Sequence, residues 1–131
     1  MPVDHVTDIQ ALIMRWCKAI REQDFDGIRD GHDPDILMFD VPPPFMSRGL
    51  DAYMTTWDIF FAATARPVEF DLRDVAITAS DEVAFATAIG RCRDLSSGEP
   101  VQLDFRLTMG LVRKAGRWRI VHEHHSLPAA G

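Results

Sequence analysis

The stretch Gly116-Arg117-Trp118-Arg119-Ile120-Val121-His122-Glu123-His124-His125-Ser126-Leu127-Pro128 decides the fold. Side chains alternate between the two faces of a β-strand. Strict alternation therefore predicts one face made of Trp118, Ile120, His122, His124 and Ser126. The other face would carry Arg119, Val121, Glu123 and His125. Because a buried imidazole needs a hydrogen-bond partner, a face that starts with a large apolar anchor and ends in two histidines indicates the polar rim of an apolar pocket.

Three helical segments precede this strand. Thr7 and Gln10 have the spacing of a capping box, so we predict a first helix that begins at Thr7. Asp24 is a good N-cap for a second, shorter helix that ends around residues 31–34. Residues 50–64 carry a wide aromatic stripe at steps of three and four, which predicts the third helix.

The rest of the sequence has the patterns of strands. A short strand is predicted over residues 36–41 and is stopped by three prolines, which cannot donate to a ladder. Four longer runs with a period of two follow, separated by turn residues: 68–79, 83–95, 101–114 and 118–126. Short turns favour antiparallel pairing. Helices followed by a long sheet indicate an α+β fold, and the length suits one domain over residues 1–131.

Composition narrows the class of partner. The formal net charge of −6 argues against nucleic acid or an anionic membrane surface as the main partner. Cys17 and Cys92 lie in unrelated segments without metal-type spacing, which is typical of reduced thiols in a cytoplasmic protein, with one disulfide between them as the alternative. The N-terminal segment lacks the pattern of a signal peptide, and no apolar run is long enough to span a bilayer.

The order of these elements, with the closing pattern Gly-x-Trp-x-Ile-x-His-x-His-x-Ser at Gly116–Ser126, resembles a known fold. It is similar to the cone of nuclear transport factor 2 and ketosteroid isomerase, and more specifically to the SnoaL-like branch of ketosteroid isomerase homologues. The closing motif also resembles the association domain of calcium/calmodulin-dependent protein kinase II. The resemblance implies three N-terminal helices packed in a strongly curved, mostly antiparallel sheet. This scaffold hosts isomerases, dehydratases, cyclases, epoxide hydrolases, transport factors and oligomerisation modules.

The resemblance to ketosteroid isomerase can be carried over residue by residue. Its catalytic aspartate, the base that moves a proton beside a carbonyl, matches Asp40 at the end of the short first strand. Its oxyanion-hole tyrosine matches Trp16, whose indole donates one hydrogen bond but is no acid. The protonated carboxylic acid of that hole falls near Thr108, a weak donor. The resemblance thus implies that the base is present and that the oxyanion hole is largely absent.

The candidate acid–base residues each have a simpler structural interpretation. Asp40 has apolar neighbours, which suit a general base, but it could also cap the strand or pair with Arg48. His122 and His124 could relay a proton, could bind a metal with a third ligand, or could be packed and satisfied by a carbonyl. Because the resembling families are mostly metal-free, we expect neither a metal nor a cofactor.

The strand predicted over residues 101–114 has two contrasting faces. Its polar face carries Gln102, Asp104, Arg106 and Thr108, and its apolar face carries Leu103, Phe105, Leu107 and Met109. If the polar face lines the cone, Arg106 could hold developing negative charge on a ligand, or could simply pair with Asp104 or Asp40. The apolar face would then be an exposed patch that a homodimer through the sheet would cover.

Two functional hypotheses remain. The first is a cofactor-free isomerase, lyase or cyclase that acts on an apolar carbonyl compound, with Asp40 as base, His124 as relay and Arg106 as the anion-holding group. The second is a non-catalytic ligand-binding or association module. Either would bind a small apolar or weakly acidic molecule. Its expected ligand-binding residues, which core packing could also explain, are Trp16, Met38, Tyr53, Trp57, Thr108 and His122.

Overall fold

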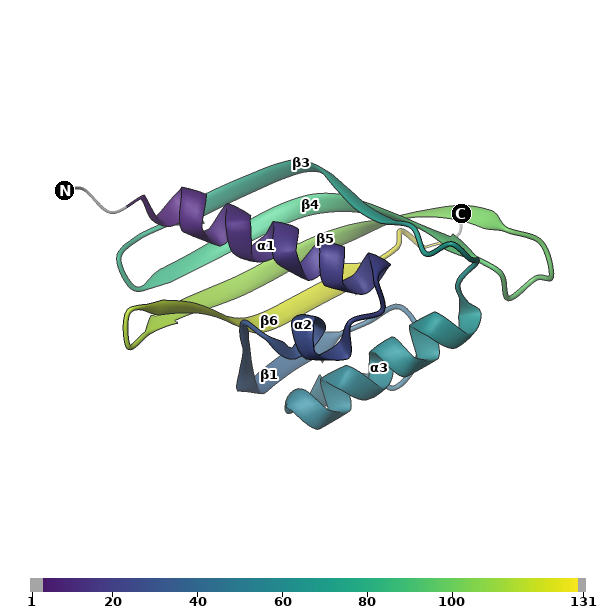
Figure 1. The fold of residues 1–131 in the computed structure, drawn as a ribbon, viewed down its shortest axis with the longest axis horizontal. Coiled ribbons are helices and arrows are strands. Elements are labelled where there is room, and N and C mark those ends of the chain that lie inside the picture. Colours follow the sequence, from purple (N-terminus) through teal and green to yellow (C-terminus); the bar gives the residue numbers. More distant parts are fainter. Residues whose placement is uncertain (1–3, 130–131) are drawn as a thin grey trace.

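The structure, a computed structural model, describes residues 4–129. Its helices are α1 (His5–Arg21), α2 (Phe25–Arg29) and α3 (Leu50–Ala63). Its strands are β1 (His32–Phe39), β2 (Ser47–Arg48), β3 (Phe70–Ala79), β4 (Val83–Asp94), β5 (Val101–Lys114) and β6 (Arg117–Ser126). The three helices lie on one face of a curved sheet (Figure 1). The predicted α+β fold with a mostly antiparallel sheet is confirmed.

The six strands are ordered β2-β1-β6-β5-β4-β3. All neighbours are antiparallel except β1 and β6, which run parallel and pair Phe39 with His124. β6 therefore lies inside the sheet, between β1 and β5. Because parallel strands end at the same edge, the carboxyl ends of β1 and β6 lie together.

Helix α1 begins earlier than its sequence pattern predicts. The N-cap is Asp4, whose carboxylate accepts the Thr7 backbone N–H at 3.0 Å and the Thr7 hydroxyl at 2.6 Å. Asp4, and not Thr7, caps the helix because a carboxylate offers two acceptors and its negative charge is favourable at a helix N-terminus. The predicted cap of α2 is correct, since Asp24 accepts the Gly27 N–H at 3.0 Å.

Strand β5 faces the opposite way from the arrangement considered above. Phe105, Leu107 and Met109 are buried beneath the helices, whereas Arg106 and Thr108 are exposed on the outer face. Burial of a large apolar side chain contributes about 1.5–3 kcal/mol, so the apolar row takes the side that the helices cover. The exposed apolar patch from which we expected a homodimer through the sheet is absent from β5, and that expectation loses its basis.

The core lies between the helices and the concave face of the sheet. α1 contributes a buried stripe at steps of three and four residues, Ile9, Ile13, Trp16 and Ile20. Trp16 contacts the rings of Trp57 from α3 and Phe70 from β3 edge-on, at centroid distances of 5.9 and 5.2 Å. Among residues 4–129, no helix combines the length and apolarity that crossing a membrane requires.

Candidate functional site

Strand β6 contains a β-bulge that reverses the alternation of its side chains. His122 pairs with Gly110 and Ile120 pairs with Leu111, so Val121 is the extra residue. Ile120 and Glu123 consequently both face the core, although they are three residues apart. The prediction that His122 and His124 share the inner face with Trp118 is wrong. Glu123 and His125 occupy that face instead.

Glu123 is the centre of a buried polar cluster. Its carboxylate is completely buried and accepts hydrogen bonds from Tyr53 Oη at 2.8 Å, His32 Nε2 at 2.5 Å and His125 Nε2 at 2.9 Å. Trp16 Nε1 in turn donates to Tyr53 Oη at 3.0 Å. Because a carboxylate only accepts, these contacts place a proton on Nε2 of both imidazoles. Burial alone would raise the pKa of Glu123, but the hydrogen bonds from His125 and His32 lower it to about 2.

His125 carries the complementary charge. Burial alone would lower the pKa of this imidazole, but its hydrogen bond to Glu123 and the negative charges of Glu123 and Asp40 outweigh that effect and raise it above 6.5. The two shifts agree in direction, since each partner favours the ionised form of the other. The ring also stacks on Phe105, with centroids 5.5 Å apart. Gly90 leaves room for that ring, because a Cβ there would lie 2.1 Å from Phe105 Cζ.

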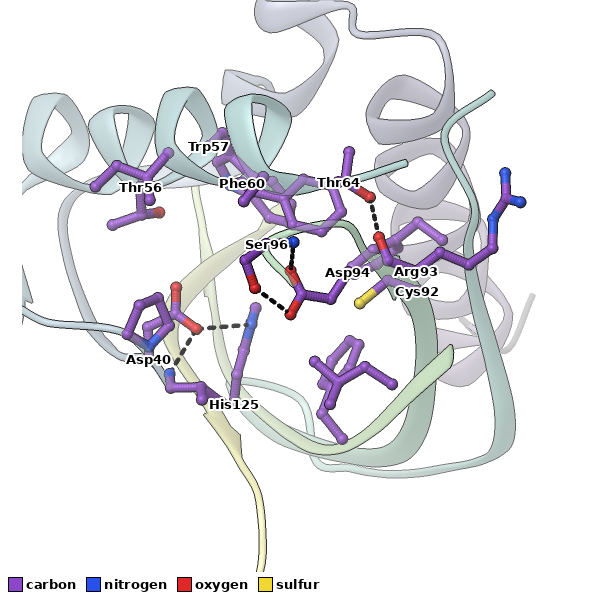
Figure 2. A pocket seen from close by; sticks show the side chains of 17 residues that line it. Asp40, Thr56, Trp57, Phe60, Thr64, Cys92, Arg93, Asp94, Ser96 and His125 are labelled. Carbon is purple, nitrogen blue, oxygen red and sulfur yellow. Dashed lines mark hydrogen bonds and ion pairs between the residues drawn. The ribbon is translucent and has the colours of Figure 1, made fainter. Parts of the chain in front are cut away.

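Asp40 faces the other ring nitrogen of His125. Asp40 Oδ1 lies 3.6 Å from His125 Nδ1 and accepts the Val41 N–H at 2.8 Å (Figure 2). The Asp40 side chain is 21% exposed, whereas that of His125 is 8% exposed. The parallel pairing of β1 and β6 produces this meeting, since Asp40 directly follows β1 and His125 is near the end of β6. His125 is thus held from behind by one carboxylate and faced by a second.

The pair opens into a cavity of about 330 Å³ whose lining is largely apolar. This volume lies at the lower end of the range for small-molecule sites. Aromatic walls come from α3, β3 and β5. The residues that line the cavity include four aromatic side chains, a thiol and a second carboxylate: Trp57, Phe60, Phe70, Phe105, Cys92 and Asp94. A buried acid–base pair on the wall of such a cavity can move a proton to or from a bound molecule.

Comparison with family models identifies the fold family. Residues 9–130 match the model described as SnoaL-like domain. The chain belongs to the SnoaL-like domain family. A comparison with curated proteins found no match.

Solved structures place this SnoaL-like domain among the NTF2-like proteins. It is similar to an NTF2-like protein of unknown function from Pseudomonas putida KT2440, with 29% identity over 98% of this chain and 92% of the other, and a TM-score of 0.85. The CaMKII hub of S. rosetta is 21% identical over 96% and 98% of the two chains, with a TM-score of 0.80. A candidate ketosteroid isomerase from Shewanella frigidimarina NCIMB 400 is 18% identical over 88% and 92%, with a TM-score of 0.72. The last two likenesses concern the fold alone.

Within this SnoaL-like domain, two of the three predicted catalytic residues, His124 and Arg106, lie outside the cavity. His124 is exposed on the outer face, and the outward-facing Arg106 donates from Nε to Ser126 Oγ at 3.2 Å. Asp40 faces the cavity, but its neighbour there is His125. It pairs with neither of the arginines that the sequence suggested.

The predicted ligand-binding residues divide into three groups. Trp57 lines the cavity. Trp16, Met38 and Tyr53 are buried, and the first and third belong to the hydrogen-bonded cluster around Glu123. Thr108 and His122 lie towards the outer face, where His122 Nδ1 donates to the Leu37 carbonyl at 2.7 Å. This last contact matches the simpler interpretation of His122.

The functional residues that the sequence interpretation missed are Glu123, His125 and His32. A carboxylate flanked by histidines in a strand that also carries Trp118 and Ile120 is one signal for such a cluster, because imidazoles can neutralise a buried acid. His32 gave no comparable signal, since it lies in the segment that was assigned to the end of α2. Within residues 4–129, no group of three or more His, Cys, Asp or Glu side chains is placed to hold a metal ion.

Proposed function

We propose that this SnoaL-like domain is a small-molecule enzyme, a cofactor-free isomerase, lyase or cyclase that moves a proton beside a carbonyl of an apolar compound. The observation that carries the proposal is the facing pair of Asp40 and His125 on the wall of an apolar cavity. The buried Glu123 behind His125 adds to it, because a surface histidine would need no such support. This architecture is compatible with a neutral ligand whose polar group reaches the pair.

In the proposed reaction, Asp40 is the general base. Its carboxylate removes a proton from the carbon beside the carbonyl. The electron pair of that C–H bond forms a carbon–carbon double bond, and the π pair of the carbonyl moves onto its oxygen. His125 in its protonated form donates from Nδ1 to this oxygen, while Glu123 retains the hydrogen bond from Nε2. The raised pKa of His125 keeps that donor proton available near neutral pH. Return of the proton to another carbon gives an isomerase, and loss of a leaving group gives a lyase.

Enolisation of a panel of small cyclic ketones tests this mechanism. Exchange of α-hydrogens for deuterium, followed by NMR, measures proton transfer without knowledge of the natural substrate. We expect Asp40→Asn and His125→Gln each to reduce exchange on the order of a hundredfold or more. His124→Gln is the matched control, since it changes the neighbouring histidine outside the cavity. Full exchange activity in Asp40→Asn would refute the proposed role of Asp40.

A non-catalytic ligand-binding or association module is the second candidate. The observation that favours it is an exposed apolar segment beside the cavity mouth. In the loop after β1, Phe45 is 95% exposed, Met46 is 49% exposed, and Val41 is 45% exposed while also lining the cavity. Sedimentation at micromolar concentration tests association, including the homodimer that the sequence suggested. A monomer with Asp40-dependent exchange activity would support the enzyme.

We also infer a reducing compartment such as the cytoplasm. Cys17 and Cys92 are free and buried. Burial raises the pKa of the Cys17 thiol to about 12 and that of Cys92 to about 11, so both are protonated and unreactive near neutral pH. Cys92 on the cavity wall is therefore an apolar lining residue in this proposal, with no nucleophilic role.

A further inference from the structure

We propose that the cavity excludes anions and accepts uncharged or positively charged ligands, and that Asp94 is the residue that sets this selectivity. The inference rests on the proposed function because it concerns the same cavity. It adds the charge class of the ligand, which the acid–base pair alone does not determine. It also departs from the weakly acidic molecule that the sequence suggested as a ligand.

Two carboxylates line the cavity, Asp40 and Asp94. Asp94 is at the end of β4 and is held by Ser96, whose backbone N–H and hydroxyl donate to its two oxygens at 3.2 and 2.7 Å (Figure 2). These hydrogen bonds hold the carboxylate at the cavity wall. Asp94 has no part in the proposed proton transfer, so it is free to act on the ligand through its charge.

The positive charges near the cavity are matched by other carboxylates. The guanidinium of Arg93 points away from Asp40 and His125 (Figure 2). Its Nη2 donates to the Pro67 carbonyl at 2.8 Å, and its Nε lies 3.2 Å from the Glu69 carboxylate. The positive charge of His125 is matched by Glu123. Because Glu69 and Glu123 neutralise the two cationic residues among the described lining residues, Arg93 and His125, the charge left at the cavity wall is that of Asp40 and Asp94 and is negative.

The apolar walls of the cavity strengthen the effect of this negative charge on a bound ligand. Trp57, Phe60, Phe70 and Phe105 surround the space with apolar surface, where charges are screened less than in water. A ligand carboxylate would lose its hydration and would face Asp40 and Asp94, while the positive charges of His125 and Arg93 are already shared with Glu123 and Glu69. Binding of such an anion is therefore costly. A ligand ammonium group would be attracted by the carboxylates and by the faces of the aromatic rings.

Three probes with one aromatic skeleton test the inference: 2-acetylnaphthalene, which is neutral, 2-naphthoate, an anion, and 2-naphthylmethylammonium, a cation. NMR titration of the full chain gives the dissociation constant of each. We expect naphthoate to bind at least about tenfold more weakly than the ketone. In Asp94→Asn that ratio should fall several-fold, because the amide keeps an acceptor for Ser96 but loses the charge.

The matched control is Asp51→Asn, which removes a carboxylate that is 99% exposed and paired with Arg29 on another part of the surface. It should leave the ratio unchanged. Amide spectra of both variants establish that the fold is retained. Equal binding of ketone and naphthoate would overturn the inference while leaving the cavity and its acid–base pair intact. An unchanged ratio in Asp94→Asn would overturn the assignment to that residue. If none of the probes binds, the inference falls together with the proposed function.

Discussion

His124 and His125 are adjacent in the sequence and lie in opposite environments. The His125 ring is enclosed by Trp16, Trp57 and Phe105, is bonded to a buried carboxylate and faces a cavity. The His124 side chain is on the outer face, where its nearest ring is that of Phe39 at 5.4 Å. The two residues are of the same type and are neighbours in the sequence, and the bulge at Val121 decides which of them faces the cavity. The comparison shows that one extra residue in a strand changes which of its side chains face the interior, and hence which can line a site.

The largest effect should come from removing the charge behind the inner histidine. In Glu123→Gln, His32 and His125 lose their ionised acceptor, and we expect a loss of about 3–5 kcal/mol in the free energy of unfolding, as for other broken buried pairs. Urea denaturation near neutral pH measures it. The matched control is His124→Gln, which should change stability by no more than about 0.5 kcal/mol.

The pH dependence of the same variant provides an internal check. The pKa of Glu123 falls from 4.5 to about 2 on folding, so its contribution to stability is present above pH 4.5 and is lost as the pH falls towards 2. The difference in stability between the wild type and Glu123→Gln should therefore shrink over this range, by roughly 1.4 kcal/mol per pH unit at most. A difference that stays constant down to pH 2 would show that packing, and not charge, is lost.

A smaller effect should appear as the pH rises above 6.5 and should depend on His125. Its pKa is raised above 6.5 in the folded chain, so its contribution to stability is fully present below pH 6.5 and is lost as the pH rises through the raised pKa. His125→Gln should lack this decline, whereas His124→Gln should keep it. Denaturant titrations at a series of pH values, with NMR titration of the ring, measure both. An NMR pKa for His125 at or below 6.5 would contradict the ion pair.

The smallest effect is expected from deletion of Val121. Removing the extra residue makes the pairing of β6 with β5 regular, and Ile120, Glu123 and His125 would all still face inward. We expect the free energy of unfolding to fall by about 1 kcal/mol, because the backbone on either side of the deleted residue must readjust. The raised pKa of His125 should be retained. NMR titration of the deletion variant measures this. A loss as large as that of Glu123→Gln, with the pKa shift abolished, would mean that the bulge geometry itself forms the cluster.

The sequence predicted the order of the elements except for the two-residue strand β2, and it failed at the facing of two strands. The helix periods, the triple proline and the turn residues carry local information, so the bounds of β5 were predicted in full and those of most other elements nearly so. A bulge depends on the pairing of two strands, and nothing in the local pattern around Val121 records it. The inner face of β5 follows the rule that the apolar row is buried, and the charged Arg106 lies on the opposite, exposed face.

The candidate site was half predictable for the same reason. Asp40 was found because it ends a strand and matches a position in a resembling family. Its partner depends on β1 lying parallel to β6, a contact between residues 85 positions apart, which alternation within either strand cannot specify. Glu123 was assigned to the outer face, where a carboxylate needs no explanation. Its actual burial is favourable only because Tyr53, His32 and His125 all donate to it.

The interior place of β6 has a consequence for how the chain reaches its native state. β6 is last in sequence order among the six strands, yet it joins β1 to β5. Before β6 docks, β1 and β5 each have an unpaired edge, and the concave face of the sheet lacks the strand that lies between them. Asp40 and His125 can meet only after β6, the last strand in the sequence, has paired with β1. Contacts of high sequence separation must therefore form before the cavity exists. The proposed proton-transfer activity should therefore be regained in the final step of refolding, together with full burial of Glu123, and never ahead of it.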